Sequence, residues 1–385
     1  MKRIALAILI ISIMILGVVT DLMVNVLGYT SINYAMPSAN VGYVKYTLIL
    51  YNNTLLQGNV VSPKSHLAPF GIIYVNGRIY VADSGSDTVS VINSTTNHVV
   101  ENITIKGSPF SLLYDPSNGY IYVTSPVSLF VIDPSTNQVI ANISLLSPQP
   151  VLDSMAYDPS KGYIYLISSS IIFPLFVINS STNEVIHGIK LGRLPHDMVI
   201  PSGILYDPSN GYIYVTDYRS NSVLVINTST DKVIANISVG LGPSSMAYDP
   251  SNGYVYVTDF KSNTISVINS KNNAVVANIP VGQAPLGIVY DPSNGYIYVT
   301  DAKSNMVSVI NPSTNQVIAN ITVGNYPSGI VYDPSNGYIY VTNYLSGSIS
   351  IIATTLPEQA TQSLPIVYII IRYNCSSSSR VGGLN

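Results

Sequence analysis

The sequence predicts an all-β protein: a seven-bladed β-propeller of four-stranded antiparallel blades, preceded by an N-terminal signal or anchor segment. The first observation is that eleven residues, YDPSNGYIYVT, recur unchanged or nearly so at 114–124, 157–167, 206–216, 248–258, 290–300 and 332–342. The second is that a tyrosine of this phrase marks seven units spaced by 42, 43, 49, 42, 42 and 42 residues, at Tyr80, Tyr122, Tyr165, Tyr214, Tyr256, Tyr298 and Tyr340. The third is that each unit holds short β-rich runs between turn residues, and a strand repeat of this length is typical of propeller blades.

The composition limits both the class of protein and its partners. The chain has 385 residues, of which 47% are apolar, so it can bury a large core. Charged residues make up 9% of the chain, the formal net charge is -3, and no run of Lys or Arg occurs. This balance argues against nucleic acid as a partner, because a phosphate backbone is held by clustered cations. The sole cysteine, Cys375, rules out an internal disulfide or a thiolate metal cluster.

The N-terminal residues predict export. Lys2 and Arg3 precede an uncharged apolar run, Ile4 to Val19, and a polar break follows at Thr20 and Asp21. A basic start followed by an apolar run is the pattern of a secretory signal. We expect residues 1–35 to act either as a cleaved signal peptide or, if they are retained, as a single N-terminal membrane anchor.

Potential glycosylation sites agree with export. The sequence contains nine N-x-[ST] sequons, at Asn52, Asn93, Asn102, Asn142, Asn179, Asn227, Asn236, Asn320 and Asn374. In an exported chain such asparagines are acceptors for glycans on surface positions. Several recur because the repeat recurs, and Asn-Ile-Thr or Asn-Ile-Ser is also ordinary edge-strand sequence, so the pattern admits both explanations.

The unit at 286–323 shows how one blade is built. PLGIVY, YIYVT, MVSVIN and QVIANITV are four β-rich runs. The turn at 291–295 combines Pro292, which fixes φ, with Gly295, which accepts the positive φ of a short bulged loop. Alternation places Tyr298 and Thr300 on one face of the second strand and Val299 on the other. Bulky groups on both faces are expected of a sheet that packs between two neighbouring blades.

These units resemble the YVTN family of β-propeller repeat proteins. The phrase Tyr-Val-Thr-Asn stands intact at 340–343 and as Tyr-Val-Thr-Asp at 214, 256 and 298, and the resemblance covers about residues 44–355. It implies a seven-bladed propeller, often exported or on the cell surface, including surface-layer-associated proteins of archaea. Related propellers include binding proteins, haem d1 and quinone enzymes, and lyases or lactonases, so the resemblance implies no single activity. Residues 356–385 form a C-terminal tail outside the propeller.

Closure of the ring needs a fourth strand from outside the seventh unit. That unit has three strand-like runs before Thr354 and then no fourth. Because an open ring would expose sheet edges, we expect the stretch from Thr54 to Val61 to complete the last blade. The run Thr47 to Leu50 is either a further strand or a competitor for the third position.

One rim of the propeller carries a partial ring of acids. Asp83, Asp217, Asp259 and Asp301 end the second strands of four units, and Ser125, Ser168 and Asn343 replace them in the others. Oxygen donors on a rim suit a cation or a cationic ligand. The alternative is that each carboxylate accepts backbone N–H bonds within its own turn, which repeated turn acids commonly do.

Departures from the repeat give further candidates for binding. The 49-residue spacing comes from extra residues around 193–200, which bring Arg193, His196 and Asp197 to the same rim, and a second long loop holds His66. Imidazole and carboxylate groups can ligate a metal or act as bases. The two loops enter the fourth and first units, almost opposite in a ring of seven, so we expect no shared two-histidine site. Nonrepeated acids in the inner strands are scarce, and Asp153 is almost alone there.

Together these features predict an exported, monomeric cell-surface propeller that binds a surface protein or a glycan. We expect no catalysis, no cofactor and no metal, because the sequence contains no close histidine motif, phosphate loop or Gly-x-Ser-x-Gly elbow. The alternative is a metal-assisted lyase or lactonase whose site lies at the channel mouth.

Overall fold

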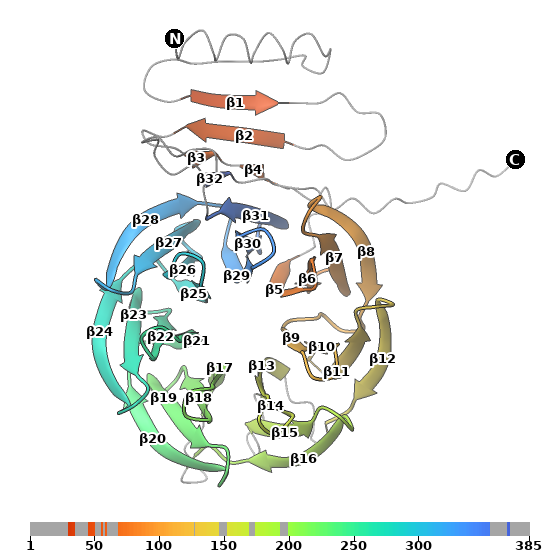
Figure 1. Cartoon of the computed structure of the whole chain (residues 1–385), viewed down its shortest axis with the longest axis vertical. Helices are drawn as coiled ribbons and strands as arrows, with labels where there is room; N and C mark the ends of the chain where they lie inside the picture. Colours follow the sequence, from red (N-terminus) through yellow and green to blue (C-terminus); the bar gives the residue numbers. More distant parts are fainter. Residues whose placement is uncertain are drawn as a thin grey trace, which may run out of the picture.

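The fold is a ring of β-sheets arranged like the blades of a propeller (Figure 1). The computed structural model describes residues 30–34, 45–50, 55–56, 58–59, 68–126, 128–145, 152–168, 174–192, 199–354 and 368–369. Six of its sheets have four antiparallel strands in sequence order, and the seventh blade belongs to a six-stranded sheet, so the predicted seven-bladed β-propeller is confirmed. The predicted signal run Ile4 to Val19 lies outside the described residues. Within the described residues, no helix is long and apolar enough to cross a membrane.

Each blade repeats the same four positions from the channel outward. The innermost strands are β5 (Pro69–Val75), β9 (Leu112–Asp115), β13 (Leu152–Asp158), β17 (Pro201–Asp207), β21 (Pro243–Asp249), β25 (Pro285–Asp291) and β29 (Pro327–Asp333). The second strands are β6 (Arg78–Asp83), β10 (Tyr120–Thr124), β14 (Tyr163–Ser168), β18 (Tyr212–Asp217), β22 (Tyr254–Asp259), β26 (Tyr296–Asp301) and β30 (Tyr338–Asn343).

The two outer positions follow the same order. The third strands are β7 (Thr88–Asn93), β11 (Leu129–Asp133), β15 (Leu175–Asn179), β19 (Ser222–Asn227), β23 (Thr264–Asn269), β27 (Met306–Asn311) and β31 (Ser348–Ala353). The outermost strands of the first six blades are β8 (His98–Thr104), β12 (Gln138–Ile143), β16 (Glu184–Ile189), β20 (Lys232–Ser238), β24 (Ala274–Pro280) and β28 (Gln316–Thr322). The four strands predicted within 286–323 are therefore confirmed, and Gly295 takes the expected positive φ of 76°.

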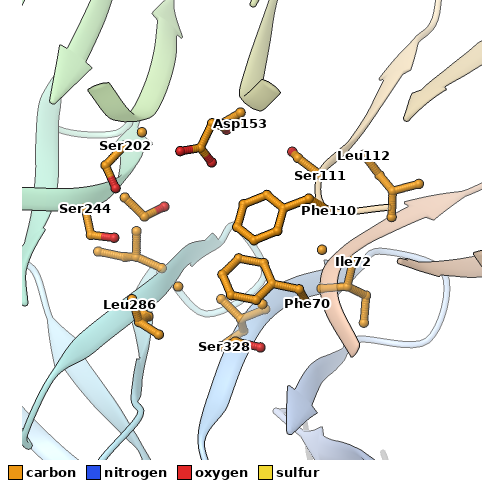
Figure 2. Close-up of a pocket in the computed structure, with 18 of the residues that line it drawn as sticks. Phe70, Ile72, Phe110, Ser111, Leu112, Asp153, Ser202, Ser244, Leu286 and Ser328 are labelled. Atoms are coloured by element: carbon orange, nitrogen blue, oxygen red, sulfur yellow. The ribbon is translucent and has the colours of Figure 1, made fainter. Parts of the chain in front are cut away.

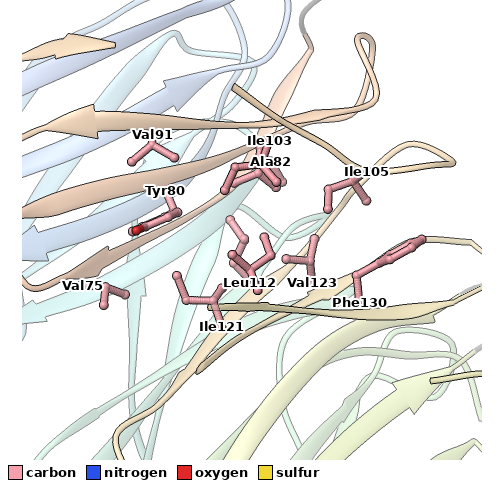
Figure 3. Packing of buried hydrophobic residues seen from close by; sticks show 12 residues of the cluster. Val75, Tyr80, Ala82, Val91, Ile103, Ile105, Leu112, Ile121, Val123 and Phe130 are labelled. Carbon is pink, nitrogen blue, oxygen red and sulfur yellow. The ribbon is translucent and has the colours of Figure 1, made fainter. Parts of the chain in front are cut away.

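The core lies between blades, which explains why both faces of the second strand are apolar. Between blades 1 and 2, Tyr80 and Val91 pack against Ile121 and Val123 (Figure 3). Equivalent clusters fill every interface of the ring, including that between blade 7 and blade 1, where Tyr340 packs with Ile79. Full burial of an isoleucine side chain contributes about 1.5–3 kcal/mol, so each interface is a substantial source of stability.

The repeated tyrosine carries a polar bond as well as apolar surface. The Tyr122 hydroxyl donates to the next blade, where Asn183 Oδ1 lies at 2.9 Å and the Ser180 carbonyl at 3.0 Å. Tyr340 of blade 7 reaches Asn97 Oδ1 of blade 1 at 2.8 Å in the same way. The buried hydroxyl thus finds a partner across the interface, which a tyrosine in a core requires.

The threonine of the YVT phrase joins neighbouring blades near the channel. Thr300 Oγ1 accepts a bond from Gly287 N at 2.8 Å and donates to the Ser328 carbonyl of the next blade at 2.9 Å. The same bridge recurs at Thr124, Thr216, Thr258 and Thr342. One hydroxyl therefore satisfies two backbone groups and fixes the inner strand of the following blade.

The ring is closed by an N-terminal strand. β4 (Gly58–Asn59) pairs antiparallel with β31 at Asn59↔Ser350, so this part of the predicted segment from Thr54 to Val61 takes the fourth position of blade 7. β2 (Lys45–Leu50) pairs with β4 and with β1 (Thr30–Tyr34), and thus forms a further strand rather than a competitor. β3 (Leu55–Leu56) pairs in parallel with β32 (Tyr368–Ile369).

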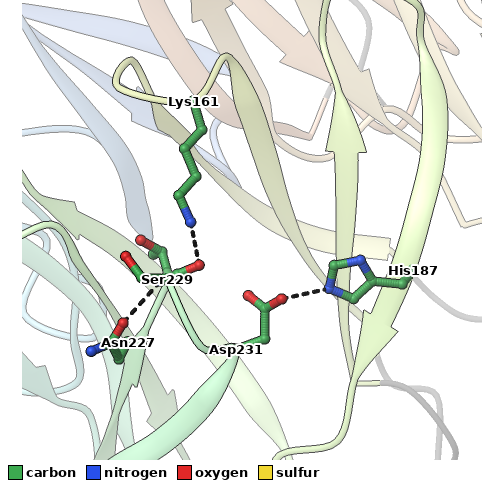
Figure 4. Close-up of polar contacts among 6 residues, drawn as sticks. Lys161, His187, Asn227, Ser229 and Asp231 are labelled. Atoms are coloured by element: carbon green, nitrogen blue, oxygen red, sulfur yellow. Dashed lines mark hydrogen bonds and ion pairs between the residues drawn. The ribbon is translucent and has the colours of Figure 1, made fainter.

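The interface between blades 3 and 4 departs from this pattern. Lys161 stands where the other YDPSNG phrases have asparagine, and its Nζ donates to the Thr228 carbonyl of blade 4. His187 Nε2 lies 3.0 Å from Asp231 Oδ2 (Figure 4). The position of the bridging threonine holds Ile167, and among the described residues the Tyr165 hydroxyl has no partner at normal hydrogen-bond distance. Ionisable side chains therefore take part in this interface, as Arg78 and Glu101 do between blades 1 and 2, where each bonds to Asn137.

Candidate functional site

Seven equivalent residues surround one end of the central channel. Six of them are the second residue of an inner strand, and Phe110 stands at the same place in its unit, just before β9. The seven residues are Phe70, Phe110, Asp153, Ser202, Ser244, Leu286 and Ser328. Most residues around this position repeat from blade to blade, whereas this one changes from aromatic to acidic, hydroxyl or aliphatic. A rigid, repeated frame with a variable lining is the arrangement expected of a binding site.

These residues line a cavity of about 300 Å³ at the channel mouth. Figure 2 shows Phe70, Phe110, Leu286 and Asp153 around it, contributed by four different blades. The cavity has an apolar side and a side of serine hydroxyl groups. A few polar groups in an otherwise apolar concavity are typical of small-molecule sites.

The apolar side is extended by further aromatic rings on the rim. The rings of Phe70 and Phe110 stack with centroids 4.0 Å apart, and Tyr344 meets Phe70 edge-on at 6.3 Å. Tyr326 lies 6.0 Å from Tyr344. Tyr344 is 37% exposed and the neighbouring Leu345 is 68% exposed, so this run of rings reaches solvent.

Cations occupy the next part of the same rim. Lys261 Nζ lies 4.2 Å from the centroid of the Tyr218 ring, and Lys303 Nζ lies 5.8 Å from that of Phe260. Both lysine side chains are exposed. Cation–π contacts of this kind contribute about 0.5–1 kcal/mol at exposed sites and hold the ammonium groups close to the rim.

Asp153 is the titratable residue among the described residues that line the cavity. Its main-chain carbonyl accepts from Thr124 Oγ1 at 3.0 Å, which anchors the backbone to blade 2. Burial raises the pKa of its carboxyl to about 7, and neither a hydrogen bond nor a neighbouring charge opposes that effect. Figure 2 shows this carboxyl directed into the cavity.

The acids predicted to form a rim ring lie instead inside their own blades. Asp83, Asp217, Asp259 and Asp301 are 3%, 5%, 0% and 0% exposed. Asp301 Oδ2 lies 2.6 Å from Ser308 Oγ, which in turn lies 2.9 Å from Asn320 Oδ1. The same chain of three side chains occurs at Asp83 and Asp259. The structure therefore does not bring these carboxylates together around one point.

Burial changes the titration of these carboxyls. It raises the pKa of Asp83 to about 7 and that of Asp259 and Asp301 to about 6, against the opposing effect of their serine hydrogen bonds. One serine proton cannot satisfy two acceptor oxygens, so a protonated carboxyl that donates to the serine fits this geometry. In blade 7 the amide of Asn343 takes the place of the acid, and its Nδ2 donates to Ser350 Oγ at 2.9 Å.

Asp217 follows the alternative given for the acidic ring. Its Oδ1 accepts a backbone bond from Arg219 N within its own turn and another from Ile200 N, in the segment that enters blade 4, each at 3.1 Å. The other predicted binding residues, Arg193, His196, Asp197 and His66, lie outside the described residues. Among the described residues, no three His, Cys, Asp or Glu side chains are grouped so that they could hold a metal ion.

The predicted glycan acceptors in the described part of the chain lie at two kinds of position. Asn102, Asn142, Asn236 and Asn320 are exposed on outermost strands. Asn93, Asn179 and Asn227 are partly exposed in the outer turns, where each Oδ1 accepts a backbone bond, for example from Ser181 N at 2.9 Å. Asn52 lies outside the described residues. Attachment of glycans remains a prediction.

Comparison with known proteins supports the fold and little beyond it. No protein-family model and no curated protein sequence matches this chain. Solved structures do: hydrazine synthase of Kuenenia stuttgartiensis matches with a TM-score of 0.65 and 18% identity over 78% of this chain and 99% of that one. A streptogramin B lyase matches with a TM-score of 0.66 and 14% identity over 77% of this chain and 96% of that one. Virginiamycin B lyase of Staphylococcus aureus matches with a TM-score of 0.63 and 14% identity over 74% and 95%.

The expectation that this protein is not an enzyme needs correction. It rested on the absence of familiar catalytic motifs from a repetitive sequence. The similar structures include a lyase and hydrazine synthase, so enzymes use this fold. Repetition does not exclude catalysis, because a site can be assembled from one variable position in each blade. At 14–18% identity the likeness shows the fold and assigns no reaction to this chain.

Apart from Asp153, which the sequence marks as a rare nonrepeated acid of an inner strand, the residues that line the cavity were not predicted, although a signal for them exists. Phe110, Asp153 and Leu286 each stand five residues before the aspartate of the Tyr-Asp-Pro turn in their unit. When the units are aligned on this turn, the three residues therefore fall in one column. The column stands out because its neighbours repeat while it varies. Neither an insertion nor a repeated acid marks a variable position inside a regular strand.

Proposed function

We propose that this protein is an exported propeller of the YVTN type that binds a glycan or a protein at the cell surface through the channel-mouth rim. The observation that carries the proposal is the run of aromatic rings from Phe110 through Phe70 and Tyr344 to Tyr326. Aromatic rings supply large contact areas with little loss of side-chain entropy, and contiguous apolar patches rimmed by polar groups mark interaction sites.

On the outer rim, outside the cavity that Asp153 lines, the charge distribution favours an occupant that is polar and neutral or anionic. Lys261 and Lys303 lie beside the aromatic run on the same rim, and Arg219 is exposed in the turn that follows Tyr218. A glycan with acidic groups meets both needs, since its ring faces stack on aromatic side chains and its acids pair with the cations. The exposed asparagines on the outermost strands leave this rim free of the sequons among the described residues.

A binding experiment tests the proposal. Acidic and neutral oligosaccharides from a cell envelope are immobilised, and binding of the full chain is measured by biolayer interferometry. The variant Phe70→Ser with Phe110→Ser places at these positions the residue that blades 4, 5 and 7 already have, so the fold should tolerate it. We expect at least tenfold weaker binding. The control Ile318→Ser changes an apolar residue, 48% exposed, on an outermost strand and should bind normally.

Two results would contradict the proposal. Equal binding by the double serine variant and the unchanged chain would remove the aromatic run from recognition. Recovery of the full chain from the cytosol, without added mass at the sequons, would contradict export. Fractionation of cells followed by mass spectrometry of Asn102 and Asn320 peptides measures both location and glycan attachment.

A further inference from the structure

The channel mouth contains one charge that the propeller itself does not use. In six of the seven equivalent positions the lining residue is uncharged, and in blade 3 it is Asp153. The other buried acids of the described residues form hydrogen bonds within their turns or with serines, as Asp207 does with Ser209 at 2.7 Å. The carboxyl of Asp153 has neither kind of partner among the described residues. A structural role in a turn therefore does not explain it.

The unfavourable desolvation of the Asp153 carboxylate indicates a ligand. Asp153 is partly buried at the channel mouth, and even partial removal of a carboxylate from water without a partner is unfavourable, in agreement with the raised pKa of its side chain. Serine at this position would avoid the cost, and blades 4, 5 and 7 have it. An uncompensated polar group directed into a cavity is a candidate for ligand recognition.

The surroundings of the carboxyl suit a cation with an apolar part. The stacked rings of Phe70 and Phe110 and the side chain of Leu286 line the same cavity. An ammonium ion placed at the carboxylate would also lie near aromatic rings, whose faces attract cations. Hydroxyl groups of Ser202 and Ser244, in the next two blades, can accept its remaining N–H bonds.

We propose that the channel mouth binds a small molecule in which a protonated primary amine is attached to an aromatic or branched aliphatic group, with Asp153 as the counter-ion. The apolar group packs on Phe70, Phe110 and Leu286, and the amine pairs with the Asp153 carboxylate in the blade next to Phe110. A volume of about 300 Å³ lies at the small end of the range for ligand sites, which limits the ligand to a single ring or a short chain. The site needs neither export nor a surface partner to operate, so it goes beyond the function proposed above.

The test compares two probes that differ in charge. Binding of 2-phenylethylamine and of 2-phenylethanol to the full chain is measured by isothermal titration calorimetry. We expect the amine to bind at least tenfold more tightly, and its affinity to rise at least tenfold between pH 5 and pH 8 as Asp153 ionises. The alcohol should show no such rise.

Variants separate the charge from the shape of the site. Asp153→Asn keeps the size of the side chain, and Asp153→Ser matches blades 4, 5 and 7; both should abolish the preference for the amine. The control Asp133→Asn removes a carboxyl on the opposite rim and should keep it. Thermal melting checks that each variant is folded.

Three results would overturn the inference. Equal affinities for amine and alcohol would show that no counter-ion acts in the site. A preference that survives Asp153→Asn would place the amine elsewhere. Saturable binding of glucose that depends on Asp153, with no binding of the amine, would identify a neutral sugar site instead.

Discussion

Neighbouring blades are joined by different side-chain contacts in blades 5 to 7 and at the interface between blades 3 and 4. In blades 5 to 7, threonine bridges and buried acid or amide groups bonded to serine repeat almost unchanged. Between blades 3 and 4, Lys161 and the pair His187 with Asp231 replace uncharged bonds, and Ile167 replaces the threonine. Asp153 also belongs to this divergent side. The difference indicates that the regular blades hold the ring while the divergent interface can vary and contribute a distinctive residue to the channel.

The largest expected effect is a loss of stability with rising pH from the regular blades. The pKa values of Asp83, Asp259 and Asp301 lie above the value of 3.8 for a free side chain. Between about pH 4 and pH 7 the folded chain therefore binds more protons than the unfolded chain. Its free energy of unfolding should fall as pH rises through this window, by about 1–3 kcal/mol for each carboxyl.

Urea unfolding from pH 4 to pH 8 measures that decline. Asp301→Asn copies Asn343 of blade 7, so it should flatten the profile, whereas Asp87→Asn at an exposed turn should leave it unchanged. A profile of the unchanged chain that rises between pH 4 and pH 7 would mean that the carboxyls are ionised in the folded state.

A smaller loss is expected when a threonine bridge is removed. In Thr300→Val the shape is kept, but Gly287 N and the Ser328 carbonyl lose their partner. An orphaned buried group costs about 1–3 kcal/mol, and Gly287 is only partly buried, so we expect about 2–3 kcal/mol of destabilisation in urea unfolding. Thr322→Val on the exposed outermost strand is the control and should change stability by less than about 0.5 kcal/mol. Equal effects of the two changes would show that the bridge does not contribute to stability.

The repeated tyrosine gives a direct test of the two kinds of interface. Tyr122→Phe removes a hydroxyl bonded to Asn183 and Ser180, and should cost about 1 kcal/mol. Tyr165→Phe at the divergent interface removes a buried hydroxyl that has no partner at normal hydrogen-bond distance in the described part of the chain, and should be neutral or stabilising. Thermal melting of both variants measures the two changes in stability. A greater loss from Tyr165→Phe would reverse the comparison.

The smallest effect is expected from the charges between blades 3 and 4. His187 and Asp231 are 40% and 36% exposed, and ion pairs at such positions contribute about 0–1 kcal/mol. Asp231→Asn restores the residue found at this place in blades 1, 2, 3, 5 and 6, so we expect a change below about 0.5 kcal/mol. Melting in low and in high salt measures it. A loss above 2 kcal/mol would show that the pair is essential to the interface.

The fold follows from the sequence because its determinants are local and repeated. Gly295 and Pro292 define a turn, and the alternation around Tyr298 defines two buried faces, so one blade suffices to predict the others. The site is harder to predict because it is built from single residues far apart in the chain. Asp153 and Phe70 meet in one cavity through ring closure, and neither residue carries a local motif. The burial of Asp301 could not be predicted from the sequence either. The same local sequence is compatible with an acid that is exposed at the rim and with one directed inward to Ser308.

The strand that closes the ring has a consequence for the order of events during synthesis. β4 leaves the ribosome early, but its partner β31 is made almost three hundred residues later. At bacterial or eukaryotic rates of about 5–20 residues per second, this delay is on the order of tens of seconds. Six blades are complete by then, and the inner strands of the first and last blades still lack their shared cluster around Tyr340 and Ile79. Final assembly is therefore a late, long-range step, and the slow phase of refolding should track the pairing of chain ends rather than the formation of any single blade.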